Sequence, residues 1–566
     1  MLVLIVFLRL TNLTFGQEVK LTFGPDLKLS KHKGFYNKLL GEEDNLLYLE
    51  LKSEKKSKVK THRIVALDKN SNEEIFSLDL LNKKEQFYKK QFKTKTLNQV
   101  QLFNGQLVLM YSEQLKSNKK YFVEVFSKEL KLIVPLVEVF DQGIYNQDIS
   151  IFESENTKVI YSPISVLPFK SGVIFSCLKN DLEKQTLSYC YNLYSLDFDL
   201  IKTSEIELQV PETELENVAF NVEKISCDNS GNIFIEERLK LINQQNRFAD
   251  SMQSQQFFIT TINPYLSESK FFEIKENDKQ FYNLKIEVNK EKVYLFGFFK
   301  STLVSDSSQI KAGIFSQEIN SEQMELLHPK YTFFTENQLA RIAKQDRPSD
   351  FYNFSNYGYT NSSNFNIEKV QFDEKGNPIL FCTKTRNLTI EVTTRDNFGY
   401  YTYTDHYFCD KYDILVFKLN EAFEFEWTSL IKRFTIFSGW DVKDIQVIED
   451  SSNFIVSYIS ENSFKEKRYS NMFFDRFVVA KIDKERGSVV VSKQDINSKN
   501  PSKKEQKICF VSDIQALNNQ FYFVSSKFML RPGAYVSSIF PPILVALQVS
   551  KKAQIEHFYI GRIDLK

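Results

Sequence analysis

The sequence predicts an all-β fold, a single β-propeller built from four-stranded antiparallel blades. Helical periodicity is almost absent along the 566 residues. What recurs is an apolar strand, a tight turn containing Asn or Gly, a second apolar strand, a polar loop and a third strand. About eight such copies follow one another at a period of roughly 58 to 85 residues, and packing them radially would bury both faces of each sheet.

Two sequence elements mark each copy. The first is a turn followed by a strand, as in residues 104–111 (NGQLVLMY) and 229–235 (NSGNIFI). The second is a strand that ends in an aliphatic residue followed by Asp or Asn, as at Leu67-Asp68 and Ile482-Asp483. Asn, Asp and Gly tolerate the positive φ that short hairpin turns require. We favour eight blades; seven blades and, as a different fold, two unlinked β-sandwiches remain open.

The two ends of the chain are expected to meet. The segment Val19–Leu29 (VKLTFGPDLKL) precedes the first full copy and alternates apolar and polar residues. It can pair with the last copy, near His557–Ile563, and so close the ring.

The first residues, MLVLIVFLRLTNLTFGQ, predict a secretory signal peptide. Leu2–Leu8 form a short apolar run, and Thr14 and Gly16 occupy the minus-three and minus-one positions of a cleavage site before Gln17. We therefore expect a signal peptide at residues 1–16 and the propeller at residues 17–566. A buried first strand is the alternative. Because a membrane span needs about 20 apolar residues, no membrane span is expected and the protein is expected to be secreted, periplasmic or associated with the cell surface.

The charge balance argues against nucleic acid as a partner. The chain has 73 Lys and Arg residues against 72 Asp and Glu residues, a formal net charge of +1. A protein that binds the phosphate backbone needs a basic field to displace counterions. The local lysine-rich runs are interrupted by Glu, Ser and Pro, which is typical of solvated hairpin tips.

One copy departs from the pattern between about residues 335 and 410. Thr335 and Gln338 have the spacing of a capping box, so a short helix is expected from Thr335, with Pro348 closing the segment. The longest internal hairpin follows, from about Thr385 to His406. Function concentrates on such insertions rather than on the strands that carry them.

The region from about 310 to 435 resembles a family of uncharacterised exported β-propeller-like proteins common in Bacteroidetes-type bacteria. The similar stretches are a helix insert, a strand at Gly376–Cys382, a Tyr/Thr-rich hairpin at Tyr400–Tyr407, a strand at Tyr412–Asn420 and an ending at Trp427–Lys432. The resemblance implies an exported propeller and brings no established activity. Cys382 and Cys409 depart from the family pattern.

The cysteines predict two disulfides rather than a metal site. None of the six forms a C-x-x-C pair, which argues against a zinc knuckle. Cys177 ends a second strand and Cys190 begins the third, and Cys382 and Cys409 hold the same places in another copy. A hairpin folded about its midpoint would set each pair opposite one another, near the separation that a disulfide needs. Buried unbridged thiols are the alternative, and that is the expectation for Cys227 and Cys509.

No motif for catalysis, metal or cofactor binding stands out. The five histidines show no paired spacing, and HExxH, G-x-S-x-G and a glycine-rich phosphate loop are absent from the sequence. Asp228-NSGN and Asp373-EKGN superficially resemble calcium loops, but they lack the later ligands and fall where the repeat needs a turn. We therefore predict turns at both places and no cofactor.

Aromatic residues are the remaining candidates for a binding site. Tyr401, Tyr403 and Tyr407 share one side of the long hairpin by strand alternation, with Tyr400 beside them. Trp440 precedes an expected innermost strand, near the mouth of the central channel. Tyr and Trp combine apolar area with a polar group, which suits sugar rings and peptides. The alternative is that they are cross-strand pairs that stabilise the sheet.

These observations favour a non-enzymatic binding or scaffolding propeller that recognises protein, peptide or glycan through loops on one face. The alternative is a hydrolase or lyase with a carboxylate-based site at the channel mouth, for which Asp441, Asp444 and Asp513 are the candidates. A third possibility is a partner subunit of an envelope complex.

Overall fold

The structure is a computed structural model. It describes residues 19–23, 35–55, 58–71, 73–80, 95–114, 118–142, 159–211, 218–241, 256–289, 292–301, 312–343, 359–395, 401–433, 435–438, 445–460, 476–495, 507–517, 520–530 and 553–565. For some strand residues, among them 19–23, 401–412 and 553–565, only the backbone is described.

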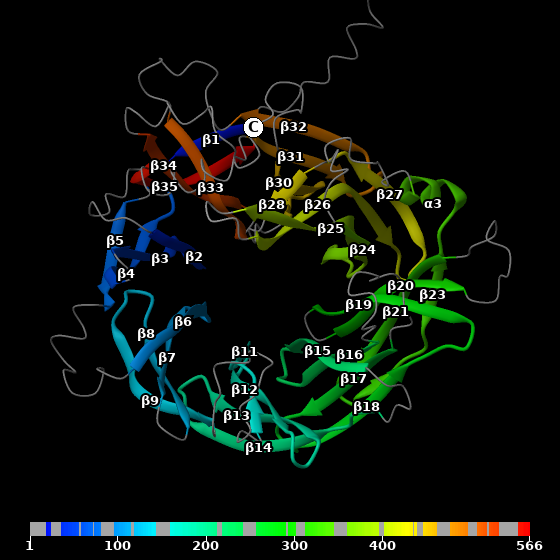
Figure 1. Cartoon of the computed structure of the whole chain (residues 1–566), viewed down its shortest axis with the longest axis horizontal. Helices are drawn as coiled ribbons and strands as arrows, with labels where there is room; N and C mark the ends of the chain where they lie inside the picture. Colours follow the sequence, from blue (N-terminus) through cyan, green and yellow to red (C-terminus); the bar gives the residue numbers. More distant parts are fainter. Residues whose placement is uncertain are drawn as a thin grey trace, which may run out of the picture. The chain divides into compact units, whose positions relative to one another are not determined.

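The described residues form eight antiparallel sheets of four or five strands. The chain divides into two units: unit 1 comprises residues 1–83, 410–416 and 427–566, and unit 2 comprises residues 84–409 and 417–426. Figure 1 shows that the whole sheets of unit 2 follow one another in chain order. The all-β class built from propeller-type antiparallel blades is confirmed, and the number of blades in the ring stays a prediction.

Unit 1 contains three whole sheets. Their strands are, sheet by sheet, β2 (Phe35–Glu43), β3 (Leu46–Lys55), β4 (Lys58–Asp68) and β5 (Glu74–Asp79); β29 (Gln446–Glu449), β30 (Asn453–Ser460), β31 (Arg476–Asp483) and β32 (Val489–Asp495); β33 (Lys507–Leu517), β34 (Gln520–Leu530), β35 (Ala553–Leu565) and β1 (Val19–Phe23).

Unit 2 contains four whole sheets. Their strands are, sheet by sheet, β6 (Lys95–Phe103), β7 (Gln106–Gln114), β8 (Lys119–Phe126) and β9 (Leu132–Gln142); β10 (Val159–Tyr161), β11 (Ser165–Phe169), β12 (Gly172–Asp181), β13 (Thr186–Ser195) and β14 (Leu200–Leu208); β15 (Val218–Cys227), β16 (Ile233–Leu241), β17 (Gln256–Asn263) and β18 (Glu268–Ile274); β19 (Lys279–Asn289), β20 (Lys292–Ser301), β21 (Ala312–Asn320), β22 (Glu325–Leu326) and β23 (Lys330–Phe333).

The eighth sheet holds the atypical copy, and its residues are divided between the two units. Its strands are β24 (Tyr359–Phe372), β25 (Pro378–Arg395), β26 (Tyr401–Leu419), β27 (Phe425–Ile431) and β28 (Thr435–Ser438). Helix α3 (Glu336–Ala343) lies between β23 and β24 along the chain. None of the helices among the described residues is long and apolar enough to span a bilayer.

Apolar cores lie between consecutive sheets rather than within them. In unit 2, one cluster joins Val123 of β8 to Phe175 of β12, and another joins Tyr191 of β13 to Ile235 of β16. A third joins Phe234 of β16 to Leu295 of β20. Neighbouring residues of one strand thus face different partner sheets, because side chains alternate along a strand. Each fully buried side chain of this size contributes about 1.5 to 3 kcal/mol to stability, so every sheet depends on its neighbours.

Strand β1 pairs with β35, so one sheet contains both the first and the last described strands. The pairing is antiparallel and runs from Val19 opposite Leu565 to Phe23 opposite Gly561. The predicted meeting of the chain ends is confirmed for residues 19–23, while residues 24–29 of the predicted segment lie outside the described residues.

The first strands of most sheets share a β-bulge that the sequence analysis did not predict. A register shift occurs at the corresponding place in β2, β6, β15, β19, β24 and β33. A bulge adds one residue to a strand and increases its local twist. Its recurrence places the residue that follows it at the same height in successive sheets.

Helix α3 begins at the predicted capping box. The Thr335 backbone N–H donates to Gln338 Oε1 at 2.8 Å, and the Gln338 N–H donates to Thr335 Oγ1 at 3.3 Å. Phe334, just before the cap, packs against Phe298, Phe417 and Phe425 with ring centroids 6.3, 5.4 and 5.8 Å apart. The helix is therefore anchored at its N-terminus to two sheets, and Pro348 lies outside the described residues.

Replacing Thr335 by alanine should loosen this helix without affecting the sheets. Loss of a side-chain cap costs about 1 kcal/mol, which corresponds to roughly fivefold faster hydrogen exchange at the amides of residues 338–343 if they exchange by local opening. Thr335→Ser, which keeps the hydroxyl, should exchange as the wild type does. Equal exchange in the alanine variant would show that the Phe334 packing alone holds the helix.

Candidate functional site: first-strand lysines and the β24–β26 arm

The two ends of each sheet differ in their connections. Tight turns join the first strand to the second and the third to the fourth, as at residues 228–232 and 263–267. The connections from the second strand to the third and from one sheet to the next include the long ones, as at residues 242–255 and 461–475, and also short ones, as at residues 56–57 between β3 and β4. We call the end of the sheet that carries them the long-connection end. Because the strands are antiparallel, the two kinds of connection lie at opposite ends of a sheet. Each sheet therefore has a tight-turn end and a long-connection end.

The tight turns are held by Asx hydrogen bonds. Asp228 Oδ1 accepts from the backbone N–H groups of Ser230 and Asn232, both at 2.9 Å. Asp373 Oδ1 accepts from Lys375 and Asn377 in the same way, at 3.0 and 2.8 Å. These carboxylates are occupied by their own turns, which confirms that both segments are turns. No group of three or more His, Cys, Asp or Glu side chains that could hold a metal ion occurs among the described residues.

A row of lysines follows the bulges of three successive first strands in unit 2. Lys224 of β15 donates from Nζ to the carbonyl oxygen of Ile286 at 2.7 Å and lies 3.7 Å from Glu287. Lys285 of β19 donates to the carbonyl oxygen of Glu368 at 3.1 Å and forms an ion pair with Glu287 at 2.9 Å. Each lysine thus reaches the first strand of the next sheet, so this row joins neighbouring sheets.

The third lysine of the row, Lys369 of β24, lies in a less favourable environment. Its pKa is lowered, chiefly by burial and then by the positive charge of Lys285, while Glu287 acts in the opposite direction. Two cationic side chains therefore face each other at successive sheets with one carboxylate between them.

Two adjacent buried glutamates lie beside this row in β16. Burial raises the pKa of Glu236 and of Glu237 to about 7. Glu236 accepts from the Ile286 backbone N–H at 3.4 Å, and the two oxygens of Glu237 accept from Thr260 Oγ1 at 3.3 and 3.1 Å. By strand alternation the two side chains point to opposite faces of their sheet. Glu236 thus contacts the next sheet at Ile286, whereas Glu237 contacts Thr260 within its own sheet.

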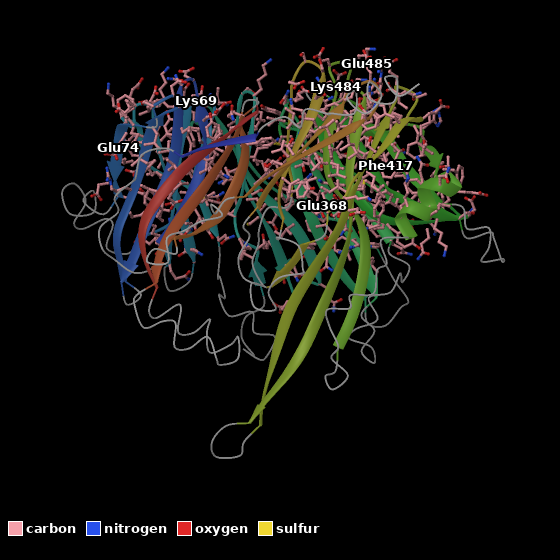
Figure 2. All side chains as sticks on the ribbon, turned by 90° about the horizontal axis from the view of Figure 1, so that it is seen from above. Lys69, Glu74, Glu368, Phe417, Lys484 and Glu485 are labelled. Carbon is pink, nitrogen blue, oxygen red and sulfur yellow. The ribbon has the colours of Figure 1, made fainter. Side chains whose placement is uncertain are left out.

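The long hairpin of the atypical copy forms an arm, which we define as residues 384–395 of β25 and 401–412 of β26. The beginning of β24 lies alongside, with Tyr359 opposite Ile390 and Asn364 opposite Thr385. At about 3.3 Å per residue, residues 384–395 span about 40 Å. Figure 2 shows the arm as a narrow ribbon that extends beyond Glu368 and Phe417, the labelled residues near its base. The arm leaves its sheet at the long-connection end.

The arm carries most of the binding residues that the sequence predicts. Tyr401, Tyr403 and Tyr407 lie on β26, where backbone alternation places them on one side of the strand. Tyr400, Trp440, Asp441 and Asp444 lie outside the described residues. Asp513 lies in β33, at the residue that follows the bulge. The structure thus supports a shared strand for three tyrosines, while the binding role and the carboxylate site stay predictions.

The predicted cysteine pairs have different outcomes. Cys177 of β12 and Cys190 of β13 are directly opposite, as predicted, but their thiols are free. Cys382 is buried on β25 with a free thiol, and Cys409 lies on β26. Cys227 is a free, half-buried thiol that donates to the carbonyl oxygen of Pro168 at 3.4 Å. The side chains of Cys409 and Cys509 lie outside the description. The disulfide between Cys177 and Cys190 is absent from this structure.

Sequence reasoning missed the lysine row and the buried glutamates. A signal for the row exists, since residues 221–225 read NVEKI and residues 366–370 read NIEKV. These two copies of one pattern place Lys224 and Lys369 at corresponding positions. The glutamates interrupt the apolar strand IFIEERL at residues 233–239, which is unusual for a buried strand.

Comparisons with known proteins assign no family. No protein-family model matches the chain, and no curated protein matches it. The resemblance to exported Bacteroidetes-type proteins therefore stays a prediction.

Solved structures with some likeness to the chain include three proteins of low sequence identity. The WD40 domain of SCAP from fission yeast has 9% identity and a TM-score of 0.31 over 94% of this chain and 98% of that one. A protein from Lactobacillus plantarum has 10% identity and a TM-score of 0.28 over 84% and 96%. The β-propeller domain of the Trilobed protease from Pyrococcus furiosus has 9% identity and a TM-score of 0.28 over 83% and 97%. Likenesses at this level identify neither a ligand nor an activity.

Proposed function

We propose that the protein is an exported, non-enzymatic binding propeller whose arm contacts a protein, peptide or glycan. The observation that carries the proposal is the arm itself. Its strands, at 18 and 19 residues, are far longer than the 7 to 11 residues of most other strands. Beyond Ile390, where the pairing with β24 ends, the arm consists of two strands, and an isolated two-stranded hairpin is only marginally stable in water. The stability of the sheet therefore gives no reason for this length. Extensions carried on a rigid scaffold are a common place for recognition.

The composition of the arm supports recognition of a polar, ring-containing or extended ligand. Its two strands contain several threonines and tyrosines, arranged in alternation over residues 401–404 (YTYT). Tyrosine supplies a large contact area at a small cost in conformational entropy and adds a hydroxyl for hydrogen bonding. The proposal of export rests on the apolar run at residues 2–8 and the cleavage pattern before Gln17. Export would also permit oxidation of Cys382 with Cys409.

Replacing Tyr401 and Tyr403 together by serine should weaken ligand retention at least about tenfold, since each aromatic contact of a binding site contributes on the order of 1 kcal/mol or more. The measurement is retention of the purified protein on an array of glycans and envelope proteins. The matched control replaces Thr402 and Thr404 by alanine, on the opposite side of β26. Unchanged retention by the tyrosine variant would exclude this side of the arm as the binding surface.

Shortening the arm tests whether it is needed for binding without removing residues that the fold needs. Joining Ile390 to His406 through a two-residue Asn-Gly turn removes the outer part of the arm but keeps the pairing of β24 with β25. The shortened protein should keep the thermal unfolding midpoint of the wild type within a few degrees and lose retention. If the shortened protein folds and still binds, the binding site is not on the outer arm, and the long connections become the candidates.

A further inference from the structure

Cys177 and Cys190 are two thiols at directly opposite positions of neighbouring strands. They are directly opposite on β12 and β13, within a continuous register that runs from Gly172 opposite Ser195 to Asp181 opposite Thr186. Opposite residues of antiparallel strands have Cα atoms about 4.5 to 5.5 Å apart, inside the range of about 4.4 to 6.8 Å that a disulfide spans. A bond between these sulfur atoms therefore requires no movement of either strand.

The two thiols differ in access. Cys177 is 1% exposed and belongs to the core between the β6–β9 and β10–β14 sheets, whereas Cys190 is only partly buried and packs against that core from its edge. A reagent from solvent therefore meets the sulfur atom of Cys190 first. The sulfur atom of Cys177 lies behind it, in position to react with whatever has bound to Cys190.

The surroundings ease the loss of one proton from the pair. The pKa of Cys177 is lowered, chiefly because the Cys190 thiol donates a hydrogen bond to the Cys177 sulfur. A hydrogen bond from Gln142 also lowers this pKa, while burial raises it. The pKa of Cys190 is raised, first by that shared hydrogen bond and then by burial. The charged neighbours are Lys179 and Glu205, which form an ion pair at 2.8 Å. One thiolate shared by two sulfur atoms is the reactive form of a dithiol.

The other described cysteines lack these features. Burial raises the pKa of Cys227 to about 12 and raises that of Cys382. Cys227 lies opposite Ile233 on the neighbouring strand of its sheet, and Cys382 lies opposite Ile367 on its β24 side. The chain therefore supplies internal controls of the same residue type.

We propose that Cys177 and Cys190 are a redox-reactive dithiol that reduces small disulfide molecules and is converted into a cross-strand disulfide. The Cys190 thiol passes its proton to the Cys177 thiolate as its sulfur attacks one sulfur of the small disulfide, so that the S–S bond breaks and one thiolate leaves. The Cys177 sulfur, after losing its proton, then attacks the Cys190 sulfur and expels the second thiolate. The two protons of the cysteine thiols end on the two released thiols, and the two electrons pass from the cysteines to the small disulfide. The inference does not depend on the proposed binding function.

The test uses the full chain, fully reduced and folded, with the aromatic disulfide 5,5′-dithiobis(2-nitrobenzoate) as the probe. The expected result is release of two equivalents of thiolate from this pair, a chain lighter by two hydrogen atoms at these positions, and a peptide in which Cys177 is joined to Cys190. Cys177→Ser should release one equivalent and keep a stable adduct on Cys190. Cys190→Ser should react at least about tenfold more slowly, because the remaining thiol is buried. Cys227→Ser should behave as the wild type does.

The reaction of the wild-type chain tests the proposal even if a serine variant does not fold. A stable adduct on Cys190 beside an unmodified Cys177 would overturn the proposal, because the second attack would then not occur. Resistance of the folded protein to the probe, with both thiols recovered unmodified, would overturn it as well.

Discussion

Replacing Glu237 by glutamine should stabilise the protein above neutral pH by about 1 to 3 kcal/mol and leave it nearly unchanged at pH 5. In the folded chain burial raises the pKa of Glu237 to about 7, from the ordinary value of 4.5 for a glutamate side chain. The folded state therefore holds a proton that the unfolded chain releases between about pH 4.5 and 7. The stability linked to this proton is fully present below about pH 4.5 and is lost as the pH rises through about 7. Glutamine has no proton to lose, so its stability should not decline over this interval.

The measurement is the urea midpoint of the wild type and the variant at pH 5, 7 and 9. Glu236→Gln should show the same sign and a similar size, because burial raises the pKa of Glu236 to about 7 as well. Glu268→Gln, at an exposed position, controls for the substitution itself. If the urea midpoints of the wild type and of Glu237→Gln change equally with pH, ionisation of Glu237 does not lower the free energy of unfolding.

Removing β1 should lower stability more than any single substitution considered above. A chain that begins at Gly24 lacks the five residues that pair with β35. The lost ladder contributes about 1 kcal/mol for each hydrogen bond, and strand β35 becomes the exposed edge of its sheet, which favours aggregation. We expect a decrease of several kcal/mol in the free energy of unfolding and a protein that associates when concentrated.

The matched control is a chain that begins at Gln17, which keeps β1 and lacks only the predicted signal peptide. Thermal unfolding and light scattering of the two chains make the comparison. Equal unfolding midpoints and equal scattering would mean that the sheet is complete without β1, and that its pairing with β35 contributes nothing to the fold.

The features that the sequence predicts well are those set by neighbouring residues. The cap of Thr335 and the turns at Asp228 and Asp373 depend on hydrogen bonds that span at most four residues, so the residue types alone indicate them. The opposition of Cys177 and Cys190 follows from strand alternation within one hairpin. The meeting of β1 and β35 was predictable because a ring of repeats leaves only those two ends to pair.

The features that the sequence does not predict depend on the adjacent sheet. The hydrogen bond from Lys224 to Ile286 crosses 62 positions of the chain, and that from Lys285 to Glu368 crosses 83. The shifted pKa of Glu237 depends on its burial in the folded chain, which the polar letters of its own strand do not indicate. The sequence predicts a disulfide at Cys177, but its thiol is free. Strand register sets only the distance between two cysteines, whereas their oxidation depends on the redox conditions.

The pairing of β1 with β35 has a further consequence for the time course of synthesis. The partner of Val19 is Leu565, which lies 546 positions further along the chain (565 − 19). At about 5 to 20 residues per second, the interval between these two residues is on the order of half a minute to two minutes. Throughout that interval β35 does not yet exist, so β1 lacks the strand that it pairs with in the folded chain and can pair with another molecule instead.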